Sequence, residues 1–118
     1  AQIILLCAFG GRLDHLLGNL QAASFAVRHG ARVRMEDAEN RLCFLSHGKL
    51  SLPERPGYSL SLLALSDECP DVSVRGVKYP LEHARITNAF PIGVSNEWRG
   101  TAEIETGSGV LLVIESKM

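Results

Sequence analysis

The spacing of apolar residues changes at Gly30, and this change constrains the fold more than any other feature of the sequence. Between Leu13 and Val27 apolar side chains recur every three or four residues, which is the period of an amphipathic helix. Asp14 stands in the first turn of that helix, and Gly30 is the type of residue that ends one. Beyond Gly30 apolar and polar residues alternate, which predicts strands.

A continuous apolar stretch precedes the helix. Residues 3–9 read Ile-Ile-Leu-Leu-Cys-Ala-Phe, which is typical of a parallel strand covered on both faces. Gly10 and Gly11 then interrupt the strand before the helix begins. A strand, a glycine turn and a helix form half of a β-α-β unit. Because such a strand is expected inside a larger sheet, we expect the chain to be cut from a longer protein.

The rest of the chain predicts short strands with turn signals about every ten residues, a spacing typical of antiparallel sandwiches. The predicted strands are residues 32–35, 41–46, 50–52, 58–65, 72–79, 84–87, 101–106 and 110–115, with a loop at 67–71. We therefore expect an α+β fold. Residues 1–30 would be the remnant of an α/β domain, and residues 31–118 would form an antiparallel β-sandwich domain.

The composition narrows the possible partners and the cell compartment. Twelve Lys and Arg against thirteen Asp and Glu give a net charge of −1, so binding to nucleic acid or to an anionic membrane is not expected. The three cysteines, Cys7, Cys43 and Cys69, lie far apart and predict reduced thiols in a cytoplasmic protein. Neither they nor the four histidines have the spacing of zinc ligands.

The segment Gly-Gly-Arg-Leu-Asp-His at residues 10–15 is the first candidate site. It lies where a strand ends and a helix begins, a usual place for a phosphate-bearing ligand. The glycines permit close approach of the backbone, and Arg12 can bind phosphate oxygens with its planar fork. Asp14 can hold Mg²⁺ or orient a hydroxyl nucleophile, or it can simply be an anion that stabilises the start of the helix.

Two further segments carry polar side chains between strands. Ser95 and Asn96, in Gly-Val-Ser-Asn-Glu-Trp at 93–98, can donate and accept hydrogen bonds toward a heterocycle, or can form an ordinary turn. Glu97 stands where a serine hydrolase has glycine, so that class is not favoured. Gly-Val-Lys-Tyr-Pro-Leu at 76–81 predicts a bulge or a sheet edge, with Lys78 either a phosphate partner or an exposed edge lysine. Trp98 can stack on a ring or pack at the end of the sandwich.

Taken in order, the segments at 10–15, 76–81 and 93–97 resemble those of thiamin pyrophosphokinases of the bacterial type. The resemblance implies an enzyme that moves the terminal pyrophosphate of ATP onto the thiamin hydroxyl, giving thiamin diphosphate and AMP with Mg²⁺. It also implies a homodimer in which thiamin lies between the α/β part of one subunit and the sandwich of the other. Gly11, Arg12 and Asp14 would bind the nucleotide, with Asp14 also a metal ligand and catalytic residue. Ser95 and Asn96 would bind thiamin.

The sequence departs from this family in two places. The family carries an aspartate-rich motif upstream of the segment at 10–15, and this chain has none. Some relatives place an aromatic residue on the last strand, where this chain has Val110 to Val113. We therefore expect the C-terminal portion of the enzyme, inactive or nearly so by itself. The alternative is a non-catalytic β-sandwich module that binds a small molecule or mediates dimerisation.

Overall fold

The computed structural model describes residues 2–6 and 12–118. Its elements, in chain order, are β1 (Gln2–Leu6), α1 (Leu13–Arg28), β2 (Arg32–Glu36), β3 (Asn40–Leu45), β4 (Gly48–Leu52), β5 (Tyr58–Ala64), β6 (Glu68–Val77), β7 (Leu81–Thr87), β8 (Gly93–Asn96), β9 (Trp98–Thr106) and β10 (Leu111–Lys117).

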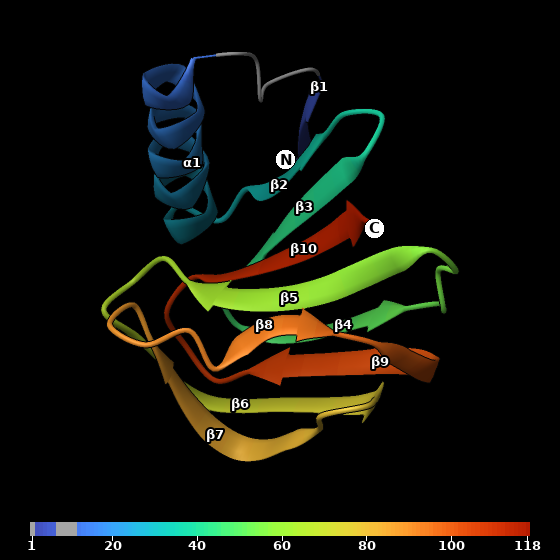
Figure 1. Cartoon of the computed structure of the whole chain (residues 1–118). Helices are drawn as coiled ribbons and strands as arrows, with labels where there is room; N and C mark the ends of the chain where they lie inside the picture. Colours follow the sequence, from blue (N-terminus) through green and yellow to red (C-terminus); the bar gives the residue numbers. More distant parts are fainter. Residues whose placement is uncertain (1, 7–11) are drawn as a thin grey trace.

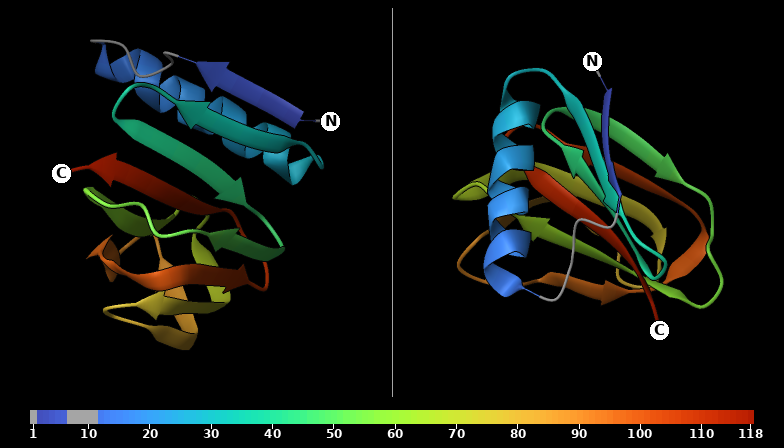
Figure 2. Two further views of the ribbon diagram at one scale, coloured as in Figure 1. Left: turned by 90° about the vertical axis from the view of Figure 1, so that its right-hand side faces the viewer. Right: turned by 90° about the horizontal axis from the view of Figure 1, so that it is seen from above.

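The elements form three layers (Figure 1). One sheet has six strands in the order β1-β2-β3-β10-β5-β8, and the other has four in the order β4-β9-β6-β7. Every strand pair is antiparallel except β1 with β2. Helix α1 lies against the outer face of the six-stranded sheet, as the side view and the view from above both show (Figure 2). The predicted α+β class, with a strand and helix followed by an antiparallel sandwich, is confirmed.

The alternation of apolar residues gives the six-stranded sheet two buried faces. Leu111 and Val113 of β10 belong to the core between the two sheets, whereas Leu112 of β10 and the preceding Val110 belong to the core beneath α1. Side chains of successive strand residues point to opposite faces, so each strand contributes to both cores. The core between the sheets contains Leu60, Val74 and Ile104 at 1% exposure each.

Helix α1 packs on the sheet mainly through its C-terminal half. Ala23 and Val27 are buried, whereas Leu13 and Leu17, which share the predicted apolar face, are 68% and 53% exposed. The helix ends as predicted, because Gly30 adopts a φ of 93° that an L side chain rarely accepts. The first half of α1 therefore presents apolar surface without a covering element among the described residues.

The strand at the start of the chain departs from the expectation of burial on both faces. In β1, Ile3, Ile4 and Leu6 are 37%, 44% and 66% exposed. Within the described residues β1 pairs with β2 alone, and this leaves its second edge open. The six-stranded sheet runs across residues 30 and 31, and the proposed division into domains 1–30 and 31–118 stays a prediction.

Two predicted loops are strands in the structure. β6 begins at Glu68 and so includes part of the loop predicted at 67–71. The register of β6 against β7 shifts between Cys69 and Val72, and Asp71 has a φ of 59°. This bulge accommodates Pro70, which cannot donate a ladder hydrogen bond. The predicted turn at Ser95 and Asn96 is part of β8, the edge strand beside β5.

Candidate functional site

Arg12 and Asp14 meet at the start of α1. Arg12 precedes the helix with an extended backbone, and its guanidinium donates from Nε to Asp14 Oδ1 over 3.2 Å and from Nη2 to Oδ2 over 2.7 Å. Asp14 Oδ1 also accepts a hydrogen bond from the backbone N–H of His15 at 2.9 Å. The side chains of the ion pair are 68% and 64% exposed, so water screens the attraction and a ligand can reach both groups.

The glycine turn that precedes this pair lies outside the described residues. Gly10 and Gly11 belong to the segment 7–11. The nucleotide-binding role predicted for Gly11 therefore stays a prediction.

Asp14 offers a single hard carboxylate for a metal ion. Among residues 2–6 and 12–118, no group of three or more His, Cys, Asp or Glu side chains converges in the way a protein-made metal centre requires. Mg²⁺ often binds through one or two carboxylates and completes its shell with water and substrate phosphates. Asp14 fits that kind of site only if the guanidinium of Arg12 releases its carboxylate oxygens, for example by turning to a phosphate.

The second candidate site is organised by the buried side chain of Asn96. Its Oδ1 accepts hydrogen bonds from the backbone N–H groups of Tyr79 and Glu97, both at 3.0 Å, and its Nδ2 donates to the carbonyl of Tyr79 at 2.9 Å. A backbone bond from Lys78 N–H to the carbonyl of Glu97, at 2.9 Å, adds to this link. Asn96 thus fastens the segment that follows β6 to the end of β8.

Ser95 lies beside this link with its side chain toward solvent. Its φ of 63° is in the left-handed region, which is unfavourable for a residue other than glycine, asparagine or aspartate. The backbone N–H of Ser95 donates to Oγ of Ser61 at 2.9 Å and holds this conformation. Because Ser95 is exposed, its hydroxyl can bind a ligand without a change of fold.

Tyr79 is a candidate binding residue that the residue types alone did not single out. Its ring is 61% exposed although Asn96 holds both of its backbone polar groups. The segment that leads into β8 adds Phe90 at 68%, Ile92 at 46% and Val94 at 50% exposure. An exposed aromatic ring on a backbone that is held in place can stack on a flat heterocycle. The signal in the sequence was a tyrosine between a bulge glycine and a proline.

Gly76 produces the bulge that the sequence predicted ahead of Tyr79. It has a φ of 77°, and a Cβ on it would lie 2.0 Å from the carbonyl oxygen of Thr101. The register of β6 against β9 shifts between Arg75 and Val77. The bulge redirects the chain toward the segment that Asn96 binds.

Trp98 packs at the end of the sandwich and does not form a stacking surface. The side chain is 6% exposed, and its Nε1 donates to the carbonyl of Leu52 at 3.2 Å. The packing interpretation is therefore the correct one, and Trp98 cannot reach a ligand in this conformation.

The cysteines that the structure describes are free thiols, as predicted. Burial raises the pKa of both Cys43 and Cys69 above the ordinary value of a thiol. A raised pKa lowers the fraction of thiolate, which is the reactive form. These two side chains are therefore packed residues and not nucleophiles. Cys7 lies outside the described residues.

The two candidate sites lie in different parts of the chain. The start of α1 is at one end of the molecule, above the six-stranded sheet, whereas β8 lies at the far edge of that sheet (Figures 1 and 2). The structure thus brings Arg12 together with Asp14, and Ser95 with Asn96 and Tyr79, but it does not join the two groups within one chain.

Helix α1, the one helix among the described residues, is too short to cross a membrane. Helix α1 has 16 residues, and within the described part of the chain no helix has the length and hydrophobicity needed to cross a membrane.

Comparison with known proteins identifies the family. The family model described as "Thiamin pyrophosphokinase, vitamin B1 binding domain" matches residues 49–111, more than half of the chain. The chain therefore belongs to this family.

Individual relatives agree with this assignment. The chain is 31% identical over 112 residues to a thiamine pyrophosphokinase of Bacillus subtilis, with 91% of this chain and 51% of the relative covered. A crystal structure of thiamine pyrophosphokinase from Bacillus subtilis superposes with a TM-score of 0.90 at 26% identity, over 98% of this chain and 55% of that one. A crystal structure of thiamin pyrophosphokinase from Geobacillus thermodenitrificans superposes with a TM-score of 0.84 at 27% identity, over 99% of this chain and 54% of that one. The chain thus spans about half the length of these relatives, which fits the predicted C-terminal portion.

Proposed function

We propose that this chain supplies the thiamin-binding surface of a thiamin pyrophosphokinase, together with part of its nucleotide site. The observation that carries the proposal is the link made by Asn96, which holds the backbone of the exposed Tyr79 and directly follows the exposed Ser95 in the chain. A flat, polar heterocycle such as the pyrimidine of thiamin needs both a stacking surface and a hydrogen-bonding group.

Ser95, Asn96 and Tyr79 take different parts in this proposal. Asn96 already uses its Oδ1 twice and its Nδ2 once within the chain, so its main role is to position Tyr79. Ser95 contacts thiamin directly through its hydroxyl, and Tyr79 stacks on the ring. Stacking by Tyr79 compensates for the aliphatic residues on β10, where some relatives have an aromatic side chain.

The reaction proposed for the whole enzyme is pyrophosphoryl transfer. The thiamin hydroxyl oxygen forms a bond to the β-phosphorus of ATP as its proton passes to solvent, and the bond from that phosphorus to the oxygen of the α-phosphate breaks, so that AMP leaves. Such reactions depend on positioning and on neutralising charge more than on covalent catalysis. Mg²⁺, when bound, supplies positive charge to the phosphate oxygens.

The chain's own contribution to this step is the pair at the start of α1. Arg12 binds a phosphate oxygen of the nucleotide, and this releases the carboxylate of Asp14 from its two hydrogen bonds. Asp14 then holds the metal or orients the thiamin hydroxyl, and Gly11 allows the backbone to approach the nucleotide. Because this pair and β8 lie apart within one chain, we propose a homodimer in which each site takes its two halves from different subunits.

Two further proposals follow. The chain by itself is inactive or nearly so, because it spans about half of its relatives. The protein is cytoplasmic, since Cys43, which is partly buried, and Cys69, which is buried, are free thiols, as expected in a reducing compartment.

A titration of the isotope-labelled chain with thiamin, followed by NMR, tests the binding surface. We expect backbone amide shifts at Tyr79, Ser95 and Asn96, and at least a fivefold loss of affinity in Ser95→Gly. Glycine accepts the left-handed backbone of residue 95, so this variant removes the hydroxyl and at the same time stabilises the fold, by up to about 1 kcal/mol.

The matched control is Ser108→Ala, which removes an exposed hydroxyl from a different loop and should leave affinity unchanged. Shifts at millimolar thiamin that avoid residues 79 and 95–96 would contradict this surface as the binding site. In that case a non-catalytic sandwich module becomes the better description.

A further inference from the structure

A groove of about 640 Å³ opens where α1 ends, at the opposite end of the helix from Arg12 and Asp14. Residues of β1, α1, β2, β3 and β4, together with turns between them, line it. Cys43, Leu45 and Leu50 give it a partly apolar lining. Its volume falls within the range of small-molecule sites.

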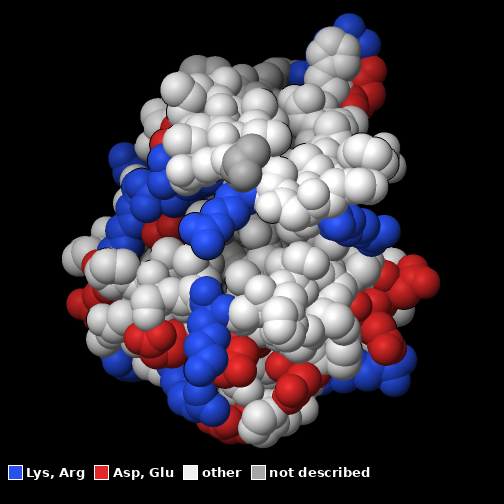
Figure 3. Space-filling view, turned by 180° about the vertical axis from the view of Figure 1, so that it is seen from behind, with Lys and Arg blue, Asp and Glu red and all other residues white. Residues whose placement is uncertain are grey.

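Basic side chains dominate the lining of this groove. It includes Arg28, Arg32, Arg34, His47 and Lys49, and no acidic residue. This concentration contrasts with the net charge of −1 for the whole chain. In the view from behind, Lys and Arg side chains cross the middle of the face, with Asp and Glu side chains between and below them (Figure 3). Cations placed around one hollow raise the local concentration of anions.

Most of these cations have no partner within the described chain. Arg28, Arg32 and Lys49 form no ion pair with any residue in the ranges 2–6 and 12–118. Arginines elsewhere are neutralised, since Arg41 pairs with Glu36 and Glu115. The groove therefore holds three cations that form no ion pair with a described carboxylate.

Arg34 lines the same groove and is only loosely paired. Its Nε is buried and has no hydrogen-bond partner among the described residues. Its Nη2 lies 3.6 Å from Oε1 of Glu36, a distance too long for a hydrogen bond. The Arg34 side chain is 36% exposed, so the end of its guanidinium can turn to an anion in the groove.

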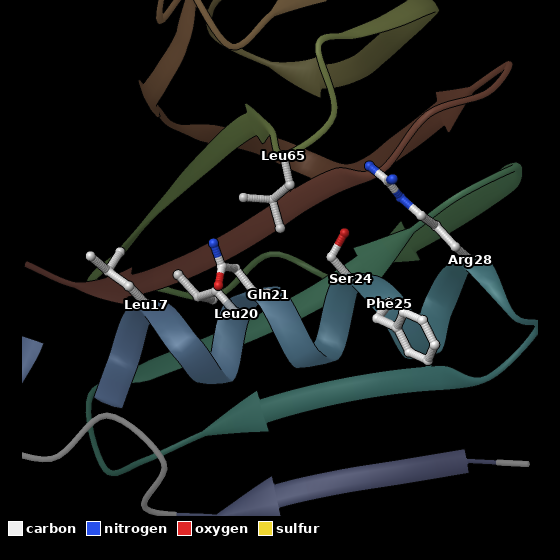
Figure 4. Close-up of a pocket in the computed structure, with 7 residues that line it drawn as sticks. All are labelled: Leu17, Leu20, Gln21, Ser24, Phe25, Arg28 and Leu65. Atoms are coloured by element: carbon white, nitrogen blue, oxygen red, sulfur yellow. The ribbon is translucent and has the colours of Figure 1, made fainter. Parts of the chain in front are cut away.

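The groove differs from the neighbouring hollow along α1. That hollow is lined mainly by Leu17, Leu20, Phe25 and Leu65, with Arg28 at its end as a shared border (Figure 4). Its side chains offer contact area for apolar groups and little charge. The basic groove therefore has its own chemistry, suited to an anion.

We propose that this groove binds a small molecule with two or more phosphoryl groups, at a site separate from the nucleotide end of α1. Planar guanidinium groups bind phosphate oxygens in pairs, and three unpaired cations match more than one negative charge. The 16 residues of α1 separate Arg28 from the start of the helix by about 24 Å. The proposal does not depend on the proposed enzymatic function.

Inorganic pyrophosphate is the probe for the test. In physiological salt, we expect it to shift the backbone amides of Ala31, Leu45 and Leu50 in the NMR spectrum of the chain, with saturation. The double variant Arg32→Gln/Lys49→Gln should weaken this binding at least tenfold. Lys49→Arg, which keeps the charge, should retain affinity within twofold.

A matched double variant controls for net charge. Arg85→Gln/Lys117→Gln also removes one arginine and one lysine, both outside the groove, and should change affinity less than twofold. The proposal is overturned if the control loses as much affinity as the groove variant. Shifts confined to residues 12–15, or no saturable shift in the well-dispersed spectrum of the folded chain, would overturn it as well.

Discussion

The two candidate sites differ in how firmly the chain holds them. Around Asn96, a buried amide makes three hydrogen bonds to the backbone, so Tyr79 and the end of β8 are set in place before any ligand arrives. At the start of α1, Arg12 and Asp14 hold each other by an exposed ion pair that water and salt weaken. One site is preorganised, and the other can exchange its partners.

This difference suits the ligands proposed for each site. A neutral hydrogen-bonding surface gains affinity when its groups do not have to be ordered on binding. At a metal-nucleotide site, the ion pair between Arg12 and Asp14 must instead break when the metal and the phosphates bind. Because this pair is exposed, breaking it costs little free energy. The comparison predicts large effects of mutation on stability at the first site and small ones at the second.

The largest effect is expected from Asn96→Ala. The variant removes three hydrogen bonds and leaves backbone groups of Tyr79 and Glu97 without their partner, so the free energy of unfolding should fall by about 3 kcal/mol. Urea denaturation measures this loss. Asn88→Ala, which truncates an exposed asparagine, serves as the control and should change stability by less than about 0.5 kcal/mol. Equal effects of the two variants would show that the link at Asn96 does not fix this site.

A much smaller effect on stability is expected from Asp14→Asn. The ion pair with Arg12 is exposed, so the loss should be no more than about 0.5 kcal/mol by urea denaturation. In a full-length protein that carries this sequence, the same variant should reduce pyrophosphoryl transfer at least a hundredfold. Full transfer activity in that variant would remove Asp14 from the mechanism.

The smallest effect on stability is expected from a change at His83, whose imidazole pairs with the carboxylate of Asp71. Its Nδ1 bonds to Asp71, and this hydrogen bond, with the attraction between the two charges, raises the pKa of His83. Glu82 also raises this pKa, whereas Arg75 lowers it.

The direction of the pH effect follows from the raised pKa. A histidine with a higher pKa in the folded chain stabilises the fold fully below its unfolded pKa of about 6.5, and loses that stabilisation as the pH rises through the folded value. The difference in thermal stability between the parent and His83→Asn should therefore shrink from pH 6 to pH 9. His15→Asn is the control. A difference that grows over this range would contradict the assigned role of Asp71.

Much of the fold could be predicted from local patterns. The helix from Leu13 to Arg28, its stop at Gly30 and most of the strands follow from the period of apolar residues and from turn residues. The strand around Pro70 was missed, since a proline normally excludes a strand interior and only the bulge at Asp71 permits it. The burial of β1 was also overestimated, because an apolar run does not reveal what covers it.

The candidate sites were predictable only in part. Ser95 and Asn96 were recognised by residue type and order, and Arg12 and Asp14 by their position between a strand and a helix. Residue type and order did not show which of these residues faces a ligand and which positions a neighbouring segment. That Asn96 binds the backbone of Tyr79, and that Trp98 is buried against Leu52, depends on contacts between segments far apart in the chain.

By itself, the sequence determined the order of the elements apart from β8, most faces of the strands and the family, because periodicity and motif order are local properties of a chain. The tertiary structure alone decided that Asn96 positions Tyr79 and that Trp98 packs inside. It also decided that unpaired basic side chains from α1, β2 and β4 line one groove. Such groupings arise when strand pairing and sheet packing bring distant residues together, and no local pattern encodes which of them will meet.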